Sequence, residues 1–263
     1  MLAKLVKFPL LKRLIPSLSI RFLKLLKKNR GYFNINKTKM FLDFLDPIDR
    51  EIILHQEFEK LEINFLIKQI NINKIDYFLD VGANCGYYSL NVAKEVSNII
   101  IRSFEPNNEA YFKFSKSLEK NLNLSKKIKL EKFGLSNKSK KLEMQSKVKF
   151  GYVQTGGSGI INDNKIKDNS IFFGNFKIGD EYIKLINRKI AIKIDVEGHE
   201  LNVLEGLKQT LKKNKCILQI EIFNDNFEKT NNFLVNNNFK KISEIKSNIN
   251  SIYKNYFYSN VGN

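Results

Sequence analysis

The stretch FLDVGANCG, residues 78–86, decides which fold this chain can adopt. The apolar run over 77–81 predicts a buried strand, and the residues over 87–95 predict a helix. Gly82 and Gly86 lie between the two, and glycine lets a backbone turn sharply and approach a bound ligand closely. The stretch predicts a ligand-binding turn from strand to helix, although a plain structural turn could use the same residues.

Strands and helices alternate along the chain beyond this turn. Further strands are expected over 98–105, 128–135, 142–146, 190–196 and 216–223, helices over 109–122 and 201–212, and a closing antiparallel pair over 239–245 and 253–259. The region 150–180 is expected to be irregular, with residues 156–159 (GGSG) as a flap or a plain loop. Such alternation predicts an α/β fold with a mostly parallel sheet, covered on both faces, that binds ligands at the carboxyl ends of its strands.

The first 72 residues differ from this pattern. We expect a basic amphipathic arm over 1–35, a helical pre-domain segment over 36–72 and the main domain over 73–263. Within the pre-domain segment, apolar residues recur from Met40 onward and Pro47 interrupts them, so helices are expected on both sides of that proline. A further helix is expected from Glu59 to about Ile70.

The basic arm has two faces. Leu18, Phe22, Leu25 and Leu26 recur at helical spacing, while Arg21, Lys24, Lys27 and Lys28 occupy the other face. Such a helix either binds an anionic membrane surface or packs on its own domain or on a partner subunit with its basic face in solvent. Both interpretations remain open.

The net charge of +18 would suit a nucleic-acid partner, because clustered Lys and Arg neutralise phosphates. Its distribution argues against one: nine basic and no acidic residues lie within residues 1–30, and the other lysines are interleaved with Asp and Glu. Cys85 and Cys216 form no CxxC pair, and no apolar run approaches the roughly 18 residues of a membrane span. We expect a cytoplasmic protein that contacts the inner membrane face only if its arm does so.

The turn carries a pattern of its own, Asp80-x-Gly82-x-Asn84-x-Gly86, which differs from the phosphate-binding GxGxxG and P-loop motifs. Its Asp and Asn offer acceptors to a cationic amino acid, which suits the methionyl end of S-adenosylmethionine. Glu105 ends the next strand about 20 residues further on, where a carboxylate can accept both hydroxyls of a ribose.

A second polar group, Asp195, Glu197 and His199, follows the strand expected over 190–196. Methyl transfer needs an acceptor oxygen in line with the methyl group and the removal of its proton. His199 or a neighbouring carboxylate could take that proton. Alternatively, Asp195 orders the cofactor's amino group, Glu197 caps the next helix and His199 packs on it. Glu221, on the neighbouring strand, is expected close to Asp195, and this pair could hold a divalent cation, bind substrate hydroxyls or share a proton.

Four segments, FLDVGANCGYYSL, SFEPNNEAY, IKIDVEGHELNVLEGL and ILQIEIF, resemble those of the FkbM family of methyltransferases. The resemblance implies a Rossmann-like class I methyltransferase fold with a mostly parallel seven-stranded sheet, helices on both faces and an N-terminal helical extension. It implies S-adenosylmethionine as methyl donor, with Asp80, Gly82, Asn84, Gly86 and Glu105 at the cofactor. The predicted cofactor site also includes Tyr87, Pro106, Asn107, Leu135, Ser136 and Asp195. The arm lies outside the resemblance.

These features together predict an enzyme that transfers a methyl group to a hydroxyl, on a sugar or a surface-glycan precursor. Its acceptor side is expected to be lined by Asp195, Glu197, His199 and Glu221. Two other classes remain as alternatives: a non-catalytic binding or scaffold protein on the same fold, and a methyltransferase acting on a nucleic acid or a lipid. The sequence does not determine whether the enzyme needs a metal ion, nor does it determine the oligomeric state.

Overall fold

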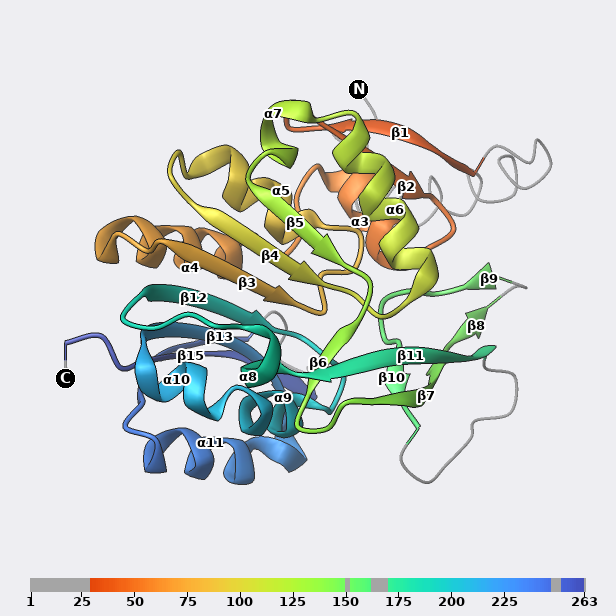
Figure 1. The fold of residues 1–263 in the computed structure, drawn as a ribbon. Helices are drawn as coiled ribbons and strands as arrows, with labels where there is room; N and C mark the ends of the chain where they lie inside the picture. The colour runs from red at the N-terminus through yellow and green to blue at the C-terminus, as the bar shows by residue number, and fades with distance from the viewer. Residues whose placement is uncertain (1–28, 150–151, 162–169, 247–251, 263) are drawn as a thin grey trace.

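The computed structural model describes residues 29–149, 152–161, 170–246 and 252–262, and it is built around one seven-stranded sheet (Figure 1). In spatial order the strands are β14 (Lys240–Ile245), β15 (Tyr253–Ser259), β13 (Lys215–Phe223), β12 (Lys189–Ile194), β3 (Tyr77–Val81), β4 (Ile100–Phe104) and β5 (Ile128–Glu131). Only β15 runs antiparallel to its neighbours. The predicted α/β class with a mostly parallel seven-stranded sheet is confirmed.

The chain reverses direction across the sheet between β3 and β12. From β3 it adds β4 and β5 on one side and then returns to place β12 on the other side of β3. An open α/β sheet binds its ligand at such a switch point, beyond the carboxyl ends of the strands. The residues after β3, β4 and β12 therefore meet at one edge.

Side chains that alternate along the strands supply two separate cores. Phe78, Ile101 and Ala191 are buried on one face, against α4 (Lys60–Asn73), α5 (Tyr87–Glu95) and α6 (Asn108–Glu119). Leu79 and Ile192 are buried on the other face, against α9 (Glu200–Gly206), α10 (Lys208–Lys213) and α11 (Phe227–Asn236). Helices therefore cover both faces (Figure 1), as a strand buried on both sides requires.

A second sheet extends beyond the carboxyl ends of the main strands. It contains β6 (Gly134–Ser136), β7 (Lys140–Ser146), β10 (Gly159–Ile160) and β11 (Ser170–Ile178), in the order β10-β7-β11-β6, beside a short pair of β8 (Val148–Lys149) and β9 (Tyr152–Val153). Two short helices, α7 (Leu122–Ser125) and α8 (Gly179–Tyr182), and a 3-10 turn at Asn224–Asn226 lie in the connecting segments. Figure 1 shows the second sheet standing at the side of the molecule toward which β3, β4 and β12 point.

Two predictions downstream of β4 are wrong. The strand expected over 128–135 is split, because β5 ends at Glu131 and β6 leaves the main sheet to pair with β11. The region 150–180 contains the nine-residue strand β11, whose pairing with β7 supplies its hydrogen bonds. Residues 162–169, on which that prediction also falls, lie outside the described residues.

The helices that follow β12 also differ from the prediction. The helix expected over 201–212 is interrupted at Leu207, and α11 was not predicted.

The pre-domain segment contains a hairpin that was not predicted. β1 (Arg30–Ile35) and β2 (Thr38–Asp43) pair antiparallel before α3 (Pro47–His55), so the helix expected before Pro47 is wrong. Met40 and Leu42 are buried while Lys39 is exposed, a period of two residues that suits a strand. The expected helices after the proline, α3 and α4, are present.

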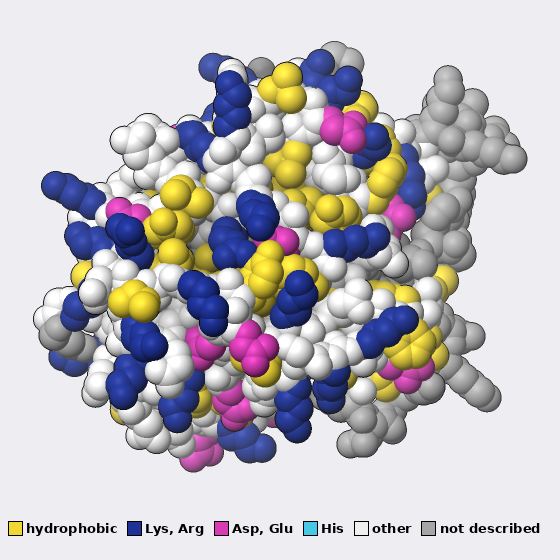
Figure 2. Space-filling model, viewed as in Figure 1, with side chains coloured by type: hydrophobic (Ala, Val, Ile, Leu, Met, Phe, Trp, Pro, Cys, Tyr) yellow, Lys and Arg dark blue, Asp and Glu magenta, His cyan; other side chains and the backbone are white. Residues whose placement is uncertain are grey.

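The basic arm falls mostly on residues 1–28, outside the described residues, so its two interpretations remain predictions. Among the helices described, none has the length and apolar character to cross a membrane. Figure 2 shows Lys and Arg side chains spread over one face of the molecule and mixed with Asp and Glu, as expected for a solvated surface.

A buried ion cluster joins the pre-domain segment to the main domain. The Lys113 ammonium, on α6, lies 2.6 Å from Asp49 Oδ2 and 3.4 Å from Asp46 Oδ2, and it donates to the Thr155 hydroxyl at 2.9 Å. Lys113 and Asp49 are only 1% and 0% exposed. The Thr155 hydroxyl also lies 3.0 Å from Asn84 Oδ1, so the cluster reaches the loop after β3.

Replacing Lys113 with Met should lower the free energy of unfolding by about 3 to 5 kcal/mol, because it leaves two buried carboxylates without their counter-charge. Lys116→Met removes a lysine from the exposed side of the same helix and should change stability little. Urea unfolding followed by circular dichroism measures both. Equal stability of the two variants would contradict a structural role for the cluster.

Candidate functional site

The loop after β3 is pressed against the end of β12. Gly82 and Gly86 both have positive φ angles, of 84° and 83°. A Cβ atom on Gly82 would lie 1.9 Å from the carbonyl oxygen of Asp195, and one on Gly86 would lie 2.2 Å from the ring of Phe114. Any side chain at these positions would push the loop out of the site. Both glycines are therefore fixed by packing as well as by backbone conformation.

Glu105 follows β4 and holds this loop in place. Its Oε2 accepts a hydrogen bond from the Asn84 amide and its Oε1 accepts one from the Asn107 amide, each at 2.8 Å. The side chain is buried, and that burial raises the pKa of Glu105 to about 7. A carboxylate has about four acceptor positions, so two remain for a ligand after both amide bonds are made.

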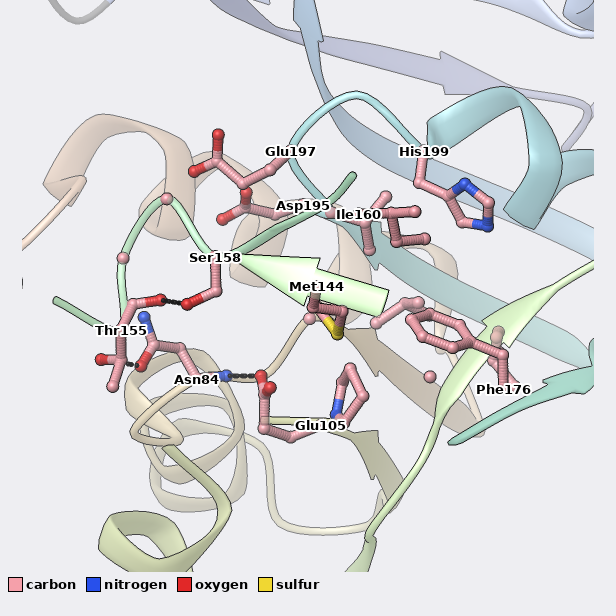
Figure 3. A pocket seen from close by; sticks show the side chains of 18 of the residues that line it. Asn84, Glu105, Met144, Thr155, Ser158, Ile160, Phe176, Asp195, Glu197 and His199 are labelled. Atoms are coloured by element: carbon pink, nitrogen blue, oxygen red, sulfur yellow. Dashed lines mark hydrogen bonds between the residues drawn. The ribbon is translucent and has the colours of Figure 1, made fainter. Parts of the chain in front are cut away.

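A first pocket opens over the loop and Glu105 (Figure 3). Among the residues predicted for the cofactor, its walls include Gly82, Asn84, Glu105, Pro106, Leu135 and Asp195. Its other walls come from residues that sequence reasoning missed, namely Ile48, Met144, Thr155, Ile160 and Phe176. These belong to α3, to the second sheet or to the loop before β10, whose packing no local motif indicates. Residues 156–158, part of the segment expected to be a flap or a plain loop, also line this pocket.

The remaining predicted cofactor residues lie around this pocket. Asn107 caps α6 by accepting from the amides of Glu109 and Ala110, and its Nδ2 donates to Ser158 at 3.1 Å. The Ser136 hydroxyl lies 2.9 Å from a ring nitrogen of His199. Asn107 and Ser136 thus brace residues of the pocket wall.

A second pocket adjoins the first and shares Gly82, Asn84, Asp195 and Glu197 with it. Its acidic lining residues are Glu51, Glu59, Asp80, Asp195, Glu197 and Glu221, and the predicted cofactor residue Tyr87 lines it as well. Among the described residues that line this pocket, Lys193 is the only basic one. The structure therefore brings Asp195 and Glu221 together, as the strand order predicted, and it adds Glu197 to them.

Lys193 is buried under this acidic group. Its ammonium lies 2.8 Å from Asp195 Oδ2 and 4.6 Å from the centre of the Tyr88 ring. Burial opposes its charge, but the attraction of Asp195, Asp80 and Glu59 is larger, so the pKa of Lys193 is raised. The lysine stays charged and compensates part of the negative charge of the pocket.

The carboxyl groups around Lys193 hold protons more tightly than usual. Burial, with repulsion from Asp195, raises the pKa of Glu197 to about 7 and raises that of Glu221. Burial also raises the pKa of Asp80, whose Oδ2 accepts from the Ser89 hydroxyl at 2.6 Å. The Asp80 Oδ1 atom is buried and has no partner among the described residues. These groups are suited to receive a cation, a hydroxyl or a proton.

His199 lies apart from the acidic group. It lines the first pocket, its ring packs at 5.8 Å against Phe176, and in Figure 3 it points away from Glu197. Burial lowers the pKa of His199 to about 4. The imidazole is therefore neutral near pH 7 and bonded to Ser136, an arrangement suited to shaping the wall of the first pocket.

The buried carboxyl groups should make the ligand-free protein less stable as pH rises from 6.5 to 8. Glu105, Glu197 and Glu200 have pKa values near 7 in the folded protein, so folding retains protons that the unfolded chain releases. We expect the free energy of unfolding to fall by about 1 to 2 kcal/mol over this interval. His199 acts in the opposite direction, but only below its ordinary pKa near 6.5.

Urea unfolding at the two pH values measures this fall. Glu197→Gln should reduce it, whereas Glu228→Gln, at an exposed position of α11, should leave it unchanged. A free energy of unfolding that stays constant or rises between pH 6.5 and 8 would contradict the prediction.

The chain matches the methyltransferase FkbM domain over residues 80–245, which includes the glycine loop, Glu105 and the acidic group. No curated protein matches it. Among solved structures, methyltransferase FkbM from Methylobacillus flagellatus has 16% sequence identity and a TM-score of 0.47, with 70% of this chain and 43% of that chain covered.

Ribosomal protein L11 methylase from Lactobacillus delbrueckii subsp. bulgaricus is 13% identical with a TM-score of 0.46, over 78% of each chain. TYW2 from M. jannaschii, solved in complex with AdoMet, is 10% identical with a TM-score of 0.47, over 88% of this chain and 84% of that chain. The domain match covers more than half of the sequence and contains the glycine loop, Glu105 and the three carboxylates Asp195, Glu197 and Glu221, although both pockets also have walls from residues outside the matched range. This chain belongs to the FkbM methyltransferase family.

Proposed function

We propose that this protein is an S-adenosylmethionine-dependent methyltransferase that methylates a hydroxyl of an uncharged, hydroxyl-rich acceptor such as a sugar or a surface-glycan precursor. The observation that carries the proposal is the pair of adjoining pockets at the sheet's switch point, one built on the glycine loop and Glu105 and the other acidic. Family membership supports the methyl donor.

The first pocket fits the adenosyl part of the cofactor. Glu105 keeps acceptor capacity for ribose hydroxyls after binding two backbone amides. Met144, Ile160 and Phe176 supply apolar surface that suits an adenine ring. The predicted roles of Glu105, Pro106 and Leu135 all belong to this half of the site.

The boundary between the pockets fits the methionyl part. Asp80 offers a buried Oδ1 without a partner among the described residues, and Gly82 leaves space that a Cβ would fill. When bound, the cofactor supplies an electrophilic methyl group on a sulfonium. Asp80 and Asp195 would stabilise its positive charges, since each lines the second pocket beside the loop.

The acidic second pocket argues for the class of acceptor. Carboxylates attract hydroxyl donors but repel phosphates and carboxylates, so an anionic acceptor group would be disfavoured. Glu197 has a pKa near 7, which suits a group that takes a proton from an acceptor hydroxyl at neutral pH. We propose Glu197, with Asp195 and Glu221 beside it, as the group that binds and deprotonates the acceptor.

The two alternative classes have less support. A nucleic-acid acceptor would bring phosphates to a pocket whose described lining has six acidic residues and one lysine. A scaffold protein would have no need of an acidic pocket that adjoins the glycine loop and the pocket over Glu105.

The cofactor assignment is tested by calorimetric titration with S-adenosylhomocysteine. Glu105→Ala should weaken binding by the roughly 1.5 to 3 kcal/mol of a charged hydrogen bond, about 10- to 100-fold. Glu105→Gln, which keeps one oxygen for the loop, should weaken it less. Glu95→Ala, at the end of α5 and outside both pockets, should bind like the wild type. If the wild type does not bind S-adenosylhomocysteine, the non-catalytic scaffold protein becomes the better-supported alternative.

The acceptor class is tested by incubating the protein with labelled S-adenosylmethionine and matched saccharides. Neutral sugars should be labelled at a rate at least tenfold above that of their phosphorylated or carboxylated forms. The product should be a methyl ether, which survives mild alkali, unlike a methyl ester. Faster labelling of the anionic forms, or label lost in alkali, would contradict a hydroxyl acceptor.

A further inference from the structure

Three carboxylates from two neighbouring strands converge in the second pocket. Asp195 and Glu197 follow the end of β12, and Glu221 lies near the end of β13. One oxygen from each lies within 4.8 Å of the other two. From the sequence, only Asp195 and Glu221 were considered as cation ligands, and the structure adds Glu197 as a third candidate ligand.

Glu221 gives independent evidence that this group receives a ligand. The residue is only 8% exposed, and its side chain lines the second pocket with one oxygen near those of Asp195 and Glu197. Across the described ranges it makes no hydrogen bond and no ion pair. Buried carboxylates are ordinarily paired or hydrogen-bonded, because an isolated buried charge is strongly unfavourable.

The protein supplies too little positive charge for these three groups. Lys193 bonds Asp195 through Oδ2, which leaves the other Asp195 oxygen available. Glu197 accepts from the Gly157 backbone amide and is attracted by Lys147, an exposed lysine whose charge is screened by solvent. Glu221 lacks even such a partner among the described residues. Three carboxylates thus face one buried lysine and one exposed lysine, and the negative charge left over is one that a bound cation would compensate.

We propose that Asp195, Glu197 and Glu221 bind a divalent cation, of the hard, oxygen-preferring class of Mg²⁺ and Mn²⁺, beside the acceptor. Such ions take carboxylate oxygens and keep coordination positions for water or substrate hydroxyls. The inference rests on the proposed function, because the cation would orient an acceptor hydroxyl and lower its pKa. With the cation bound, Glu197 serves as a ligand, and the released proton would pass to water or to another carboxylate of the second pocket such as Glu59, so no oxidant or further reactant is needed.

The test uses Mn²⁺ as the probe and does not depend on methyl transfer. Chelator-treated full-length protein is titrated with Mn²⁺, and free ion is followed by electron paramagnetic resonance. The wild type should show one saturable site, and Glu221→Gln should weaken it at least tenfold. Glu51→Gln removes a charge from an exposed residue of the same pocket outside the group, and its affinity should stay within twofold of the wild type.

Each other outcome contradicts the metal site. Absence of a saturable site in the wild type would show that the protein has no specific Mn²⁺ site. Equal weakening by Glu51→Gln and Glu221→Gln would show that only the general negative charge of the pocket attracts the ion. Saturable binding of methylammonium in place of Mn²⁺ would assign the carboxylates to an amine-bearing acceptor.

Titration of the same samples with S-adenosylhomocysteine separates this inference from the proposed function. Glu221→Gln should keep its affinity for S-adenosylhomocysteine within about threefold of the wild type, which also shows that the variant is folded. Binding of S-adenosylhomocysteine without binding of Mn²⁺ would overturn the cation site alone. Failure to bind either would overturn the proposed function.

Discussion

The contact between Gly82 and the carbonyl oxygen of Asp195 joins the ends of β3 and β12, the two parallel strands between which the strand order of the sheet reverses. The Asp195 amide continues the ladder to Val81 at 3.0 Å, and the Gly82 amide bonds the Phe104 carbonyl at 3.0 Å. Three strand ends are thereby fixed at one point, and a Cβ at Gly82 would separate them. The position of Glu105 over the loop and the presence of Asp195 in both pockets depend on this close approach.

Buried charge then organises the space around that point. Lys113 and its two aspartates hold Thr155 beside Asn84, so one wall of the first pocket depends on an ion cluster between the pre-domain segment and α6. On the other side, Lys193 neutralises part of an acidic group that otherwise holds protons. The first cluster sets one lysine against two aspartates, whereas the second sets one lysine against six acidic residues that line a pocket, and this larger excess of negative charge distinguishes the binding site.

The success of sequence reading depended on whether the interaction was local. The strand over 77–81, the helix over 87–95 and the convergence of Asp195 with Glu221 were predicted correctly, because apolar periodicity and strand order fix them. The split of 128–135 and the strand β11 were missed, because their partners are distant in sequence. The hairpin before Pro47 was mistaken for a helix, since a short apolar run fits either period.

The sequence by itself determined the α/β class, the glycine loop, the carboxylates at the strand ends and the family, because each is written in contiguous residues with a fixed period or motif. Only the tertiary structure decided which apolar residues close the first pocket, that His199 bonds Ser136 in the first pocket's wall, and that Glu197 joins Asp195 and Glu221. The physical reason is that burial and charge repulsion act between side chains brought together by folding, and a one-dimensional pattern does not record those distances.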